Sequence, residues 1–274
     1  MPIKSNDAQI RELQEEQLRS LKRQKRFYLL FFAVLAALYL IATVRTSYNP
    51  LTLLIKSRNF IDFAVNDLFP PKIDSVIGLW EIMLQTIGLA FISTFVSGVI
   101  AFLLCFAASS QIAPGALVKT VRAIASLQRN IPDVIWVFIL VMVFGIGTTV
   151  GIIALVLHTT GFLMRAFADV VDEVGRESME ALDSVGANLP AKLAQCVIPA
   201  SVPGFVSWLL YAVELNVRAA AVVGALGGGG IGLVMMGYLK SFRYHTGFGI
   251  ILVIAVTVII VDIITSFLRK RVLL

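Results

Sequence analysis

The sequence predicts an all-α, polytopic membrane protein with about six transmembrane helices. Of its 274 residues, 58% are hydrophobic and only 15% are charged, whereas soluble domains are about 45–50% apolar and about 25% charged. The apolar residues gather in runs of roughly 18 or more, long enough to cross a hydrocarbon core about 30 Å thick. No segment alternates apolar and polar residues as a strand would. The composition excludes a soluble helical protein. A secreted protein is excluded because no small-residue cleavage site follows the first apolar run, and further spans come after it.

The apolar runs divide into six expected spans. They cover residues 27–44, 84–108, 134–146 (with an amphipathic lead from 121), 149–168, 203–226 and 247–268. Residues 121–168 are too long for one crossing at 1.5 Å per residue, so we predict two spans joined by a turn at 144–149. The transmembrane domain is then 27–274, with its core spans in 84–268. An even number of spans places both ends of the chain on the same side of the membrane.

Lysine and arginine indicate which side that is, because cytoplasmic loops are enriched in them. They flank the first and last spans and occupy the second and fourth loops: Lys22, Arg23, Lys25, Arg26, Lys119, Arg122, Arg129, Arg165, Arg176, Lys192, Arg269, Lys270 and Arg271. We therefore expect a multi-pass protein of a bacterial inner membrane with both termini in the cytoplasm. The net charge of +6 reflects this topology rather than nucleic-acid binding, since the basic residues are divided among membrane-flanking positions.

Two polar segments lie outside the core spans. Residues 1–26 form a charged cytoplasmic segment with apolar residues at roughly helical spacing, which indicates either an interfacial amphipathic helix or a solvated tail. The outer loop 45–83 contains Phe69-Pro70-Pro71, which breaks any helix there. That loop is either a cap over the mouth of a path through the membrane or a simple connection.

Few residues are available for redox or metal chemistry. The cysteines are Cys105 and Cys196 and the histidines are His158 and His245, so we expect neither a disulfide framework nor a multi-histidine metal site. The sequence has no G-x-x-x-x-G-K-[ST] phosphate loop. We expect no metal or cofactor to be bound by this chain.

The cytoplasmic loop 169–202 has the pattern of a helix, a turn and a second helix. Residues 178–185 can form a short helix with one apolar face, and Gly186 tolerates the left-handed backbone of a turn. Pro190 can open a second helix in its first turn, and Pro199 marks the return to the bilayer. From these residues alone the loop is either such a motif or an ordinary connection between spans.

This loop resembles the signature E-A-A-x3-G-x9-I-x-L-P of ABC importer permeases. The matching residues here are Glu180-Ala181-Leu182, Gly186, Cys196, Ile198 and Pro199. Leu182 and Cys196 replace an alanine and an isoleucine, and both are apolar. The resemblance covers about residues 84–271. It implies a type I ABC importer permease fold and contact of an ATPase with these residues: Glu180, Ala181, Leu182, Gly186 and Pro199.

Within that family the chain looks most like the permeases of phosphonate and phosphite importers. The likeness is carried by Leu68-Phe69-Pro70-Pro71, His158-Thr159-Thr160-Gly161, Glu214-x-Asn216-Val217-Arg218, and Val223-Gly224 followed by Gly228-Gly229-Gly230-Ile231-Gly232. It implies a homodimer with two cytoplasmic ATPase subunits, which hold the ATP and Mg²⁺, and an extracytoplasmic substrate-binding protein. The implied function is import of a phosphonate or a related phosphorus oxyanion such as phosphite by alternating access, without covalent chemistry.

The fifth expected span carries two charged residues one helical turn apart, Glu214 and Arg218. A charge at mid-bilayer costs about 2.5–3.5 kcal/mol on insertion scales and usually faces the interior of the bundle. Either the two side chains pair and orient the helix, or Arg218 attracts an anion while Glu214 holds it, since a guanidinium suits oxyanions. Asn216 lies on another face of the helix, either on the substrate path or bonded to a neighbouring helix.

Two more groups are candidates for the path. His158, Thr159 and Thr160 either line a polar pore or form hydrogen bonds between helices. The glycines at the outer end of the fifth span provide a gate, a close-packing loop or an anion-binding nest of N–H groups. They are Gly227, Gly228, Gly229 and Gly230.

Three alternatives stand beside this interpretation. The first is an importer permease for another solute such as methionine, because methionine permeases share a similar glycine segment. The second is a secondary transporter with Glu214 or His158 as a proton site, which would be favoured by inverted repeats that the sequence does not show. The third is a membrane enzyme, which is disfavoured because no nucleophile, base or metal cluster is recognisable.

Overall fold

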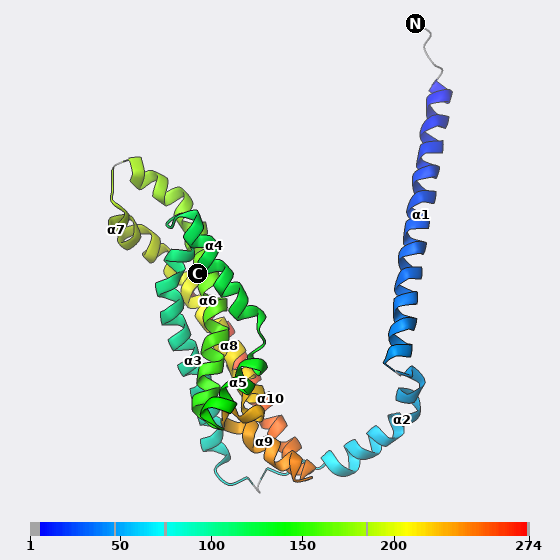
Figure 1. Ribbon diagram of the computed structural model, residues 1–274, viewed down its shortest axis with the longest axis vertical. Coiled ribbons are helices and arrows are strands. Elements are labelled where there is room, and N and C mark those ends of the chain that lie inside the picture. The colour runs from blue at the N-terminus through cyan, green and yellow to red at the C-terminus, as the bar shows by residue number, and fades with distance from the viewer. Residues whose placement is uncertain (1–5, 47, 74–75, 185, 273–274) are drawn as a thin grey trace. The chain divides into compact units, whose positions relative to one another are not determined.

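The computed structural model describes residues 6–46, 48–73, 76–184 and 186–272 (Figure 1). Within these ranges the chain is helical and contains no strand, which confirms the predicted all-α fold. Five helices are long and apolar enough to cross a membrane, or six when one bent pair is counted as a span. The chain divides into two compact units, Met1–Ala64 and Val65–Leu274.

The first unit contains α1 (Asn6–Arg45) and α2 (Pro50–Phe63). Helix α1 joins the charged N-terminal segment to the first expected span in one helix of 40 residues, of which Ser20–Arg45 is apolar enough to cross a membrane. Helix α2 lies in the segment that was expected to be an outer loop. Its start is fixed by Asn49, whose Oδ1 accepts a hydrogen bond from Leu51 N at 3.0 Å, and by Pro50 in the first turn.

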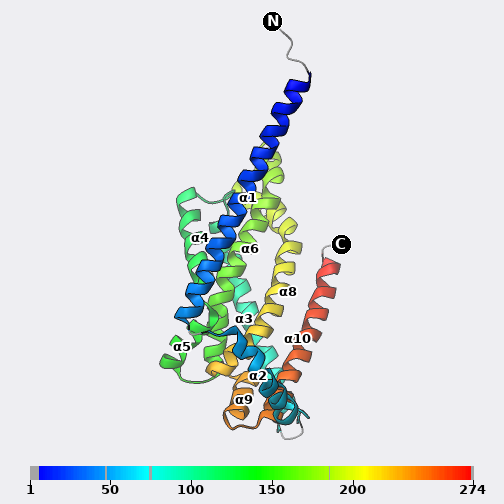
Figure 2. The same ribbon diagram turned by 90° about the vertical axis from the view of Figure 1, so that its right-hand side faces the viewer.

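The second unit is built around three packed helices, α3 (Leu79–Ala108), α6 (Thr148–Ser184) and α8 (Ile198–Val223). The buried face of α3 has small residues at helical spacing: Ala90, Ser93, Thr94, Ser97, Gly98 and Ala101. Small side chains let membrane helices approach closely, and Ser97 Oγ donates to the carbonyl of Val156 on α6 at 3.3 Å. Helix α10 (Tyr244–Val272) packs on α8, as Figure 2 shows.

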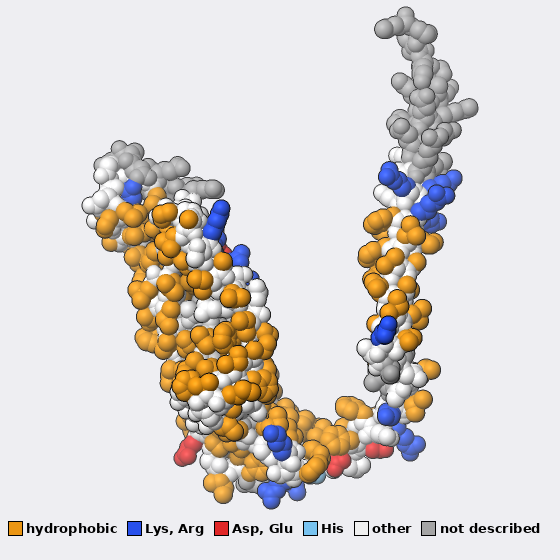
Figure 3. Space-filling view, viewed as in Figure 1, with side chains coloured by type: hydrophobic (Ala, Val, Ile, Leu, Met, Phe, Trp, Pro, Cys, Tyr) orange, Lys and Arg blue, Asp and Glu red, His pale blue; other side chains and the backbone are white. Residues whose placement is uncertain are grey.

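The outer surface of this unit is apolar, whereas its Lys and Arg side chains lie toward its two ends (Figure 3). On α3 the side chains opposite the small-residue face are exposed, among them Phe91 (53%), Phe95 (72%) and Leu103 (67%). On α10 Ile259 and Ile263 are exposed by 57% and 62%. Large apolar residues on the outside of a bundle are what a lipid environment requires.

The third expected span is broken. It consists of α4 (Gly115–Asn130) and α5 (Asp133–Phe144), bent by 83°. The amphipathic lead, expected from residue 121, is thus a separate helix that begins at residue 115. Pro132 causes the break because it lacks an N–H and its ring clashes with the preceding turn. The expected turn at 144–149 lies between α5 and α6, where Gly145 has φ +74°.

Helix α6 differs from expectation. The sequence predicted a span at 149–168 and a separate short helix at 178–185, but one helix of 37 residues runs from Thr148 to Ser184. No proline interrupts this stretch, so the helix continues past its apolar part. The turn follows at Gly186, with φ +73°.

The second helix of the loop begins where the prolines predict. Asn188 caps α7 (Leu189–Lys192), its Oδ1 accepting from Ala191 N at 3.1 Å, and Pro190 lies in the first turn. A π-helical turn, η2 (Leu193–Val197), joins α7 to α8.

The glycines after α8 pack closely against other helices. They lie in η3 (Gly224–Gly228) and at the start of α9 (Gly230–Lys240). The carbonyl of Gly227 accepts a hydrogen bond from Gly147 N at 2.9 Å, and a Cβ on Gly229 would lie 2.8 Å from Thr148 Cγ2. On Gly151 of α6 a Cβ would overlap the carbonyl oxygen of Gly228. Of the proposals for this segment, the geometry supports close packing best.

This contact makes Gly151→Ala destabilising. Alanine favours a helix over glycine by about 1 kcal/mol, so the substitution should help unless the new methyl group meets the Gly228 carbonyl. Gly88→Ala in α3 is the matched control, because a Cβ there has nothing within 4 Å. Thermal unfolding of the detergent-purified protein should show a lower Tm for Gly151→Ala and an equal or higher one for Gly88→Ala. Equal Tm values for the two variants would contradict the close contact.

Candidate functional site

Glu214 joins two helices through two arginines. Its buried carboxylate accepts a hydrogen bond from Arg218 one turn later on α8, and another from Arg269 Nη2 of α10 at 3.2 Å. The Arg269 guanidinium also lies over the ring of Tyr211, 5.5 Å from its centroid. The expected Glu214–Arg218 pair is present. Sequence analysis identified Arg269 only as a sign of topology, because nothing in a linear pattern places it beside α8.

The Arg218 side chain is only partly covered by the rest of the bundle. It is 49% exposed, and its Nη2 lies 4.0 Å from Asp262 Oδ1 on α10, whose side chain is 48% exposed. We call Glu214, Arg218, Asp262 and Arg269 the charge cluster. Charged groups that face lipid are costly, so the exposed side of this cluster indicates a face that meets water or another protein.

Asn216 connects three helices. Its Nδ2 donates to Thr94 Oγ1 of α3 at 2.9 Å, and its Oδ1 accepts from Thr159 Oγ1 of α6 at 2.8 Å. All three side chains are buried. For Asn216 and Thr159 the geometry therefore favours the interhelical hydrogen bonds over a free role on a path. Thr160 is also buried, and its Oγ1 has no hydrogen-bond partner among the described residues.

A cavity of about 170 Å³ lies between α5, α6 and α8. We call it the polar cavity; it is lined by Asp133, His158, Thr159, Phe162, Ala212, Leu215, Asn216 and Ala219. The Nδ1 atom of His158 is buried and has no hydrogen-bond partner in the described part of the chain. Asp133 was missed by the sequence analysis. The available signal was its position directly after Pro132, where the broken span turns inward.

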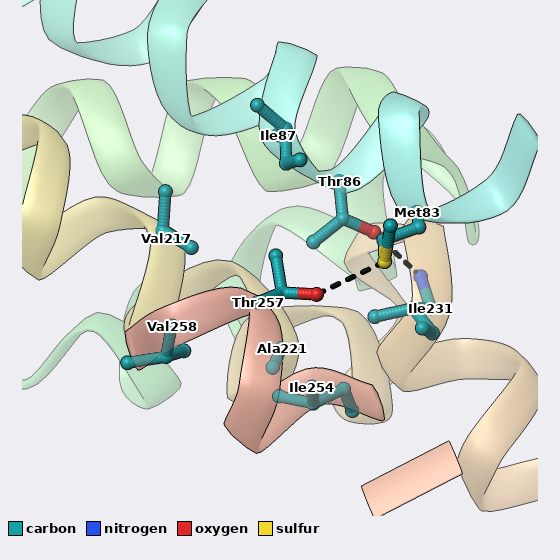
Figure 4. A pocket seen from close by; sticks show the side chains of 9 residues that line it. All are labelled: Met83, Thr86, Ile87, Val217, Ala221, Ile231, Ile254, Thr257 and Val258. Carbon is teal, nitrogen blue, oxygen red and sulfur yellow. Dashed lines mark hydrogen bonds between the residues drawn. The ribbon is translucent and has the colours of Figure 1, made fainter. Parts of the chain in front are cut away.

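A second hollow, between α3, α8, α9 and α10, is a packing junction rather than a binding site (Figure 4). Its volume is about 10 Å³, no more than one water molecule needs. Across it Thr257 Oγ1 donates to Met83 S at 2.9 Å, and Thr86 Oγ1 accepts from the backbone N–H of Ile231 at 2.8 Å. The first bond joins α10 to α3, and the second fixes the start of α9 against α3.

Arg122 forms another group that sequence patterns did not identify. Its Nη2 donates to Asp172 Oδ2 at 2.8 Å and its Nε donates to the carbonyl of Ala108 at 2.7 Å. Ser109 Oγ donates to the other Asp172 oxygen at 2.5 Å. The group ties the C-terminal end of α3 and helix α4 to α6, twelve residues before the helix ends at Ser184.

The expected coupling residues surround the turn at Gly186. Glu180 and Ala181 lie in the last part of α6, and their side chains lie outside the described residues. The carbonyl of Leu182 accepts a hydrogen bond from Ala187 N at 3.1 Å, across the turn. Gly186 and Pro199 are both exposed, so this surface is open to a partner.

Residues 105–274 match the family of the binding-protein-dependent transport system inner membrane component. The chain belongs to this family. The identification of an ABC importer permease from the loop signature is confirmed, and the membership assigns the chain to the inner membrane.

Curated relatives include permeases named for phosphorus compounds. The phosphate-import permease protein of Mycolicibacterium smegmatis is 28% identical over 220 residues, which are 80% of this chain and 41% of that protein. The phosphite transport system permease protein of Stutzerimonas stutzeri is 30% identical over 221 residues, or 80% of each chain. The methionine import system permease protein of Bacillus subtilis is 28% identical over 166 residues, 56% of this chain and 74% of that protein. The chain thus spans less than half of the first relative and four-fifths of the second.

A solved structure of a methionine ABC transporter in an inward-facing conformation has the same fold. The TM-score is 0.62 at 20% sequence identity, covering 72% of this chain and 99% of the other. This agreement confirms the predicted type I ABC importer permease fold.

The charge cluster predicts how its variants will behave. Glu214→Gln leaves two guanidinium groups without their carboxylate and should lower stability by about 3 kcal/mol, the scale of a broken buried pair. The double variant Glu214→Gln, Arg218→Met should stay below wild type, because Arg269 still lacks its partner. Lys270→Gln, an exposed charge one residue from Arg269, is the control. Yield and Tm in detergent measure the effect, and full recovery in the double variant would show that Arg269 contributes nothing.

Proposed function

We propose that this permease is the membrane-spanning subunit of an ATP-driven importer of phosphorus oxyanions, of which phosphite, phosphate and phosphonates are the candidates. The observation that carries the proposal is the 30% identity to a phosphite transport permease over four-fifths of both chains. The open side of Arg218 supports it, since a guanidinium binds oxyanions through a fork of N–H donors.

The assembly that we propose contains two copies of the chain, two cytoplasmic ATPase subunits and an extracytoplasmic substrate-binding protein. ATP and Mg²⁺ belong to the ATPases. The family description supports the binding protein, and the exposed turn at Gly186 supports docking of a motor protein. The half-exposed Arg218 and Asp262 support a second copy, because pairing two permeases turns this face away from lipid. The Lys and Arg distribution supports cytoplasmic termini.

The proposed mechanism uses α6 as a lever. ATP-driven closure of the ATPases moves the segment 180–194, which contains Glu180, Ala181, Leu182 and Gly186, while Pro199 begins the helix that follows. Helix α6 runs unbroken from there to Thr148, which lies against Gly229. A rigid helix transmits displacement along its axis, so a push at one end reaches the glycine segment Gly227–Gly230 at the other.

On the substrate path, Arg218 attracts the anion, and Glu214 orients the Arg218 side chain. His158 faces the polar cavity, and Asn216 and Thr159 fix the helices around it. Thr160 is a buried neighbour of this group.

Methionine is the second candidate substrate, because a methionine import permease is also a relative. Deleting the gene in its native bacterium tests both. Uptake of phosphite, phosphate or a phosphonate at low concentration should fall at least tenfold and return with a plasmid-borne copy. Methionine uptake should not change. Loss of methionine uptake with normal uptake of all three phosphorus compounds would reject the proposal in favour of the second candidate.

The coupling role of the Gly186 turn can be separated from simple strain. Gly186→Val forces a β-branched residue into φ +73°, which costs about 1–3 kcal/mol. Gly145→Val is the control for strain, since its φ is +74°, a Cβ there also has nothing within 4 Å, and it lies at the other end of α6. Its ψ of −176° lies in a region that is essentially restricted to glycine, so this variant should lose at least as much stability as Gly186→Val. Only Gly186→Val should lose co-purifying ATPase and transport; equal ATPase recovery with the two variants would contradict the assignment.

A further inference from the structure

The polar cavity has room for a small ligand. Its volume of about 170 Å³ is well above the roughly 10–15 Å³ that one water molecule needs on the same measure, so an ion of four or five non-hydrogen atoms fits. It is enclosed by three helices of the second unit and lies directly beside the three-helix hydrogen bonds of Asn216.

Two buried nitrogen atoms near this cavity have no hydrogen-bond partner among the described residues. They are His158 Nδ1, on a residue that lines it, and Trp136 Nε1, on α5 three residues after Asp133. Trp136 packs in the same cluster as Ala219, another lining residue. Buried polar atoms are hydrogen-bonded in the great majority of cases. An indole N–H donates only, and a neutral imidazole donates from one nitrogen, so these atoms suit a ligand with acceptor oxygens.

Asp133 supplies a hydrogen-bond acceptor. One carboxylate oxygen accepts from Val134 N at 3.0 Å, and an ionised carboxylate has further lone pairs and no proton to donate. A carboxylate repels a fully ionised oxyanion, but it accepts a hydrogen bond from an oxyanion that still carries an O–H group.

The remaining polar wall is fixed. Thr159 and Asn216 are bonded to each other, and Asn216 is bonded to Thr94, so these hydrogen bonds hold both side chains in place. The lining groups left for a ligand are therefore the carboxylate of Asp133 and the ring of His158.

We propose that the polar cavity binds a protonated phosphorus oxyanion, with Asp133 accepting from its P–O–H group and His158 donating to an unprotonated oxygen. This inference rests on the proposed function and adds a basis for specificity. A phosphorus oxyanion with a second pKa of about 6, as in a phosphate ester, keeps that proton on about half of its molecules at pH 6. Sulfate has no such proton, and a site built for a donor rejects an analogue that lacks it.

The experiment measures, by calorimetry at pH 6, direct binding of phosphite, phosphate and sulfate to the purified permease–ATPase complex in nanodiscs without binding protein. Wild type should bind phosphite or phosphate at least tenfold more tightly than sulfate. Asp133→Asn should reduce that ratio to about one, because the amide can donate to sulfate. His158→Leu should weaken both ligands. Glu81→Gln, an exposed carboxylate of α3 away from the cavity, should bind as wild type does.

The assignment is overturned if wild type binds sulfate as well as phosphite, or if it binds neither ion. It is also overturned if a folded Asp133→Asn protein keeps the wild-type preference. The wild-type comparison decides even if that variant does not fold. Failure here is distinct from failure of the proposed function, because the deletion strain reports uptake of phosphorus compounds independently of how the cavity discriminates.

Discussion

The hydrogen bonds of Asn216 to Thr94 and Thr159 are the constraint on which the second unit depends. In a membrane, an amide has no water to bond, so its partners must come from neighbouring helices. Because these partners lie on α3 and α6, the bonds fix the height at which α3, α6 and α8 cross. The polar cavity lies beside this crossing and the charge cluster begins two residues away at Glu214, so the position of both follows from it.

Helix α6 links this crossing of helices to the glycine segment at one end and to the Gly186 turn at the other. It contacts the glycine segment near Thr148, carries Thr159 and the cavity residue His158 in its middle, and holds Asp172 in the Arg122 group before it ends beside the Gly186 turn. Close packing at one end, hydrogen bonds in the middle and an ion pair near the other leave little freedom to bend. In the proposed mechanism, a displacement at the turn is therefore passed on to the cavity rather than absorbed.

Hydropathy and helix breakers predicted the part of the fold that depends on local sequence. The apolar runs located the spans, Gly186 and Pro190 located the turn and the next helix, and Pro132 accounts for the broken span. The sequence analysis did not predict that α6 continues to Ser184, because polar residues alone do not end a helix and no proline is present in this stretch. It also missed α2, for which Asn49-Pro50 was an available start signal. The partners Arg269 and Asp172 could not be foreseen, because tertiary packing of separate helices brings each to its site, whereas Asp133 had a signal in its position directly after Pro132.

The candidate polar residues differ in whether the fold already provides their hydrogen-bond or ion-pair partners. Asn216 and Thr159 have their hydrogen bonds within the bundle, and the carboxylate of Glu214 is bonded to two arginines. Arg218 remains half-exposed and His158 Nδ1 remains without a partner among the described residues. A group that folding has satisfied gains little from a passing solute, whereas an unsatisfied one gains a hydrogen bond or an ion pair. In the proposed function, the unsatisfied groups therefore recognise the solute, and the satisfied groups hold them in position.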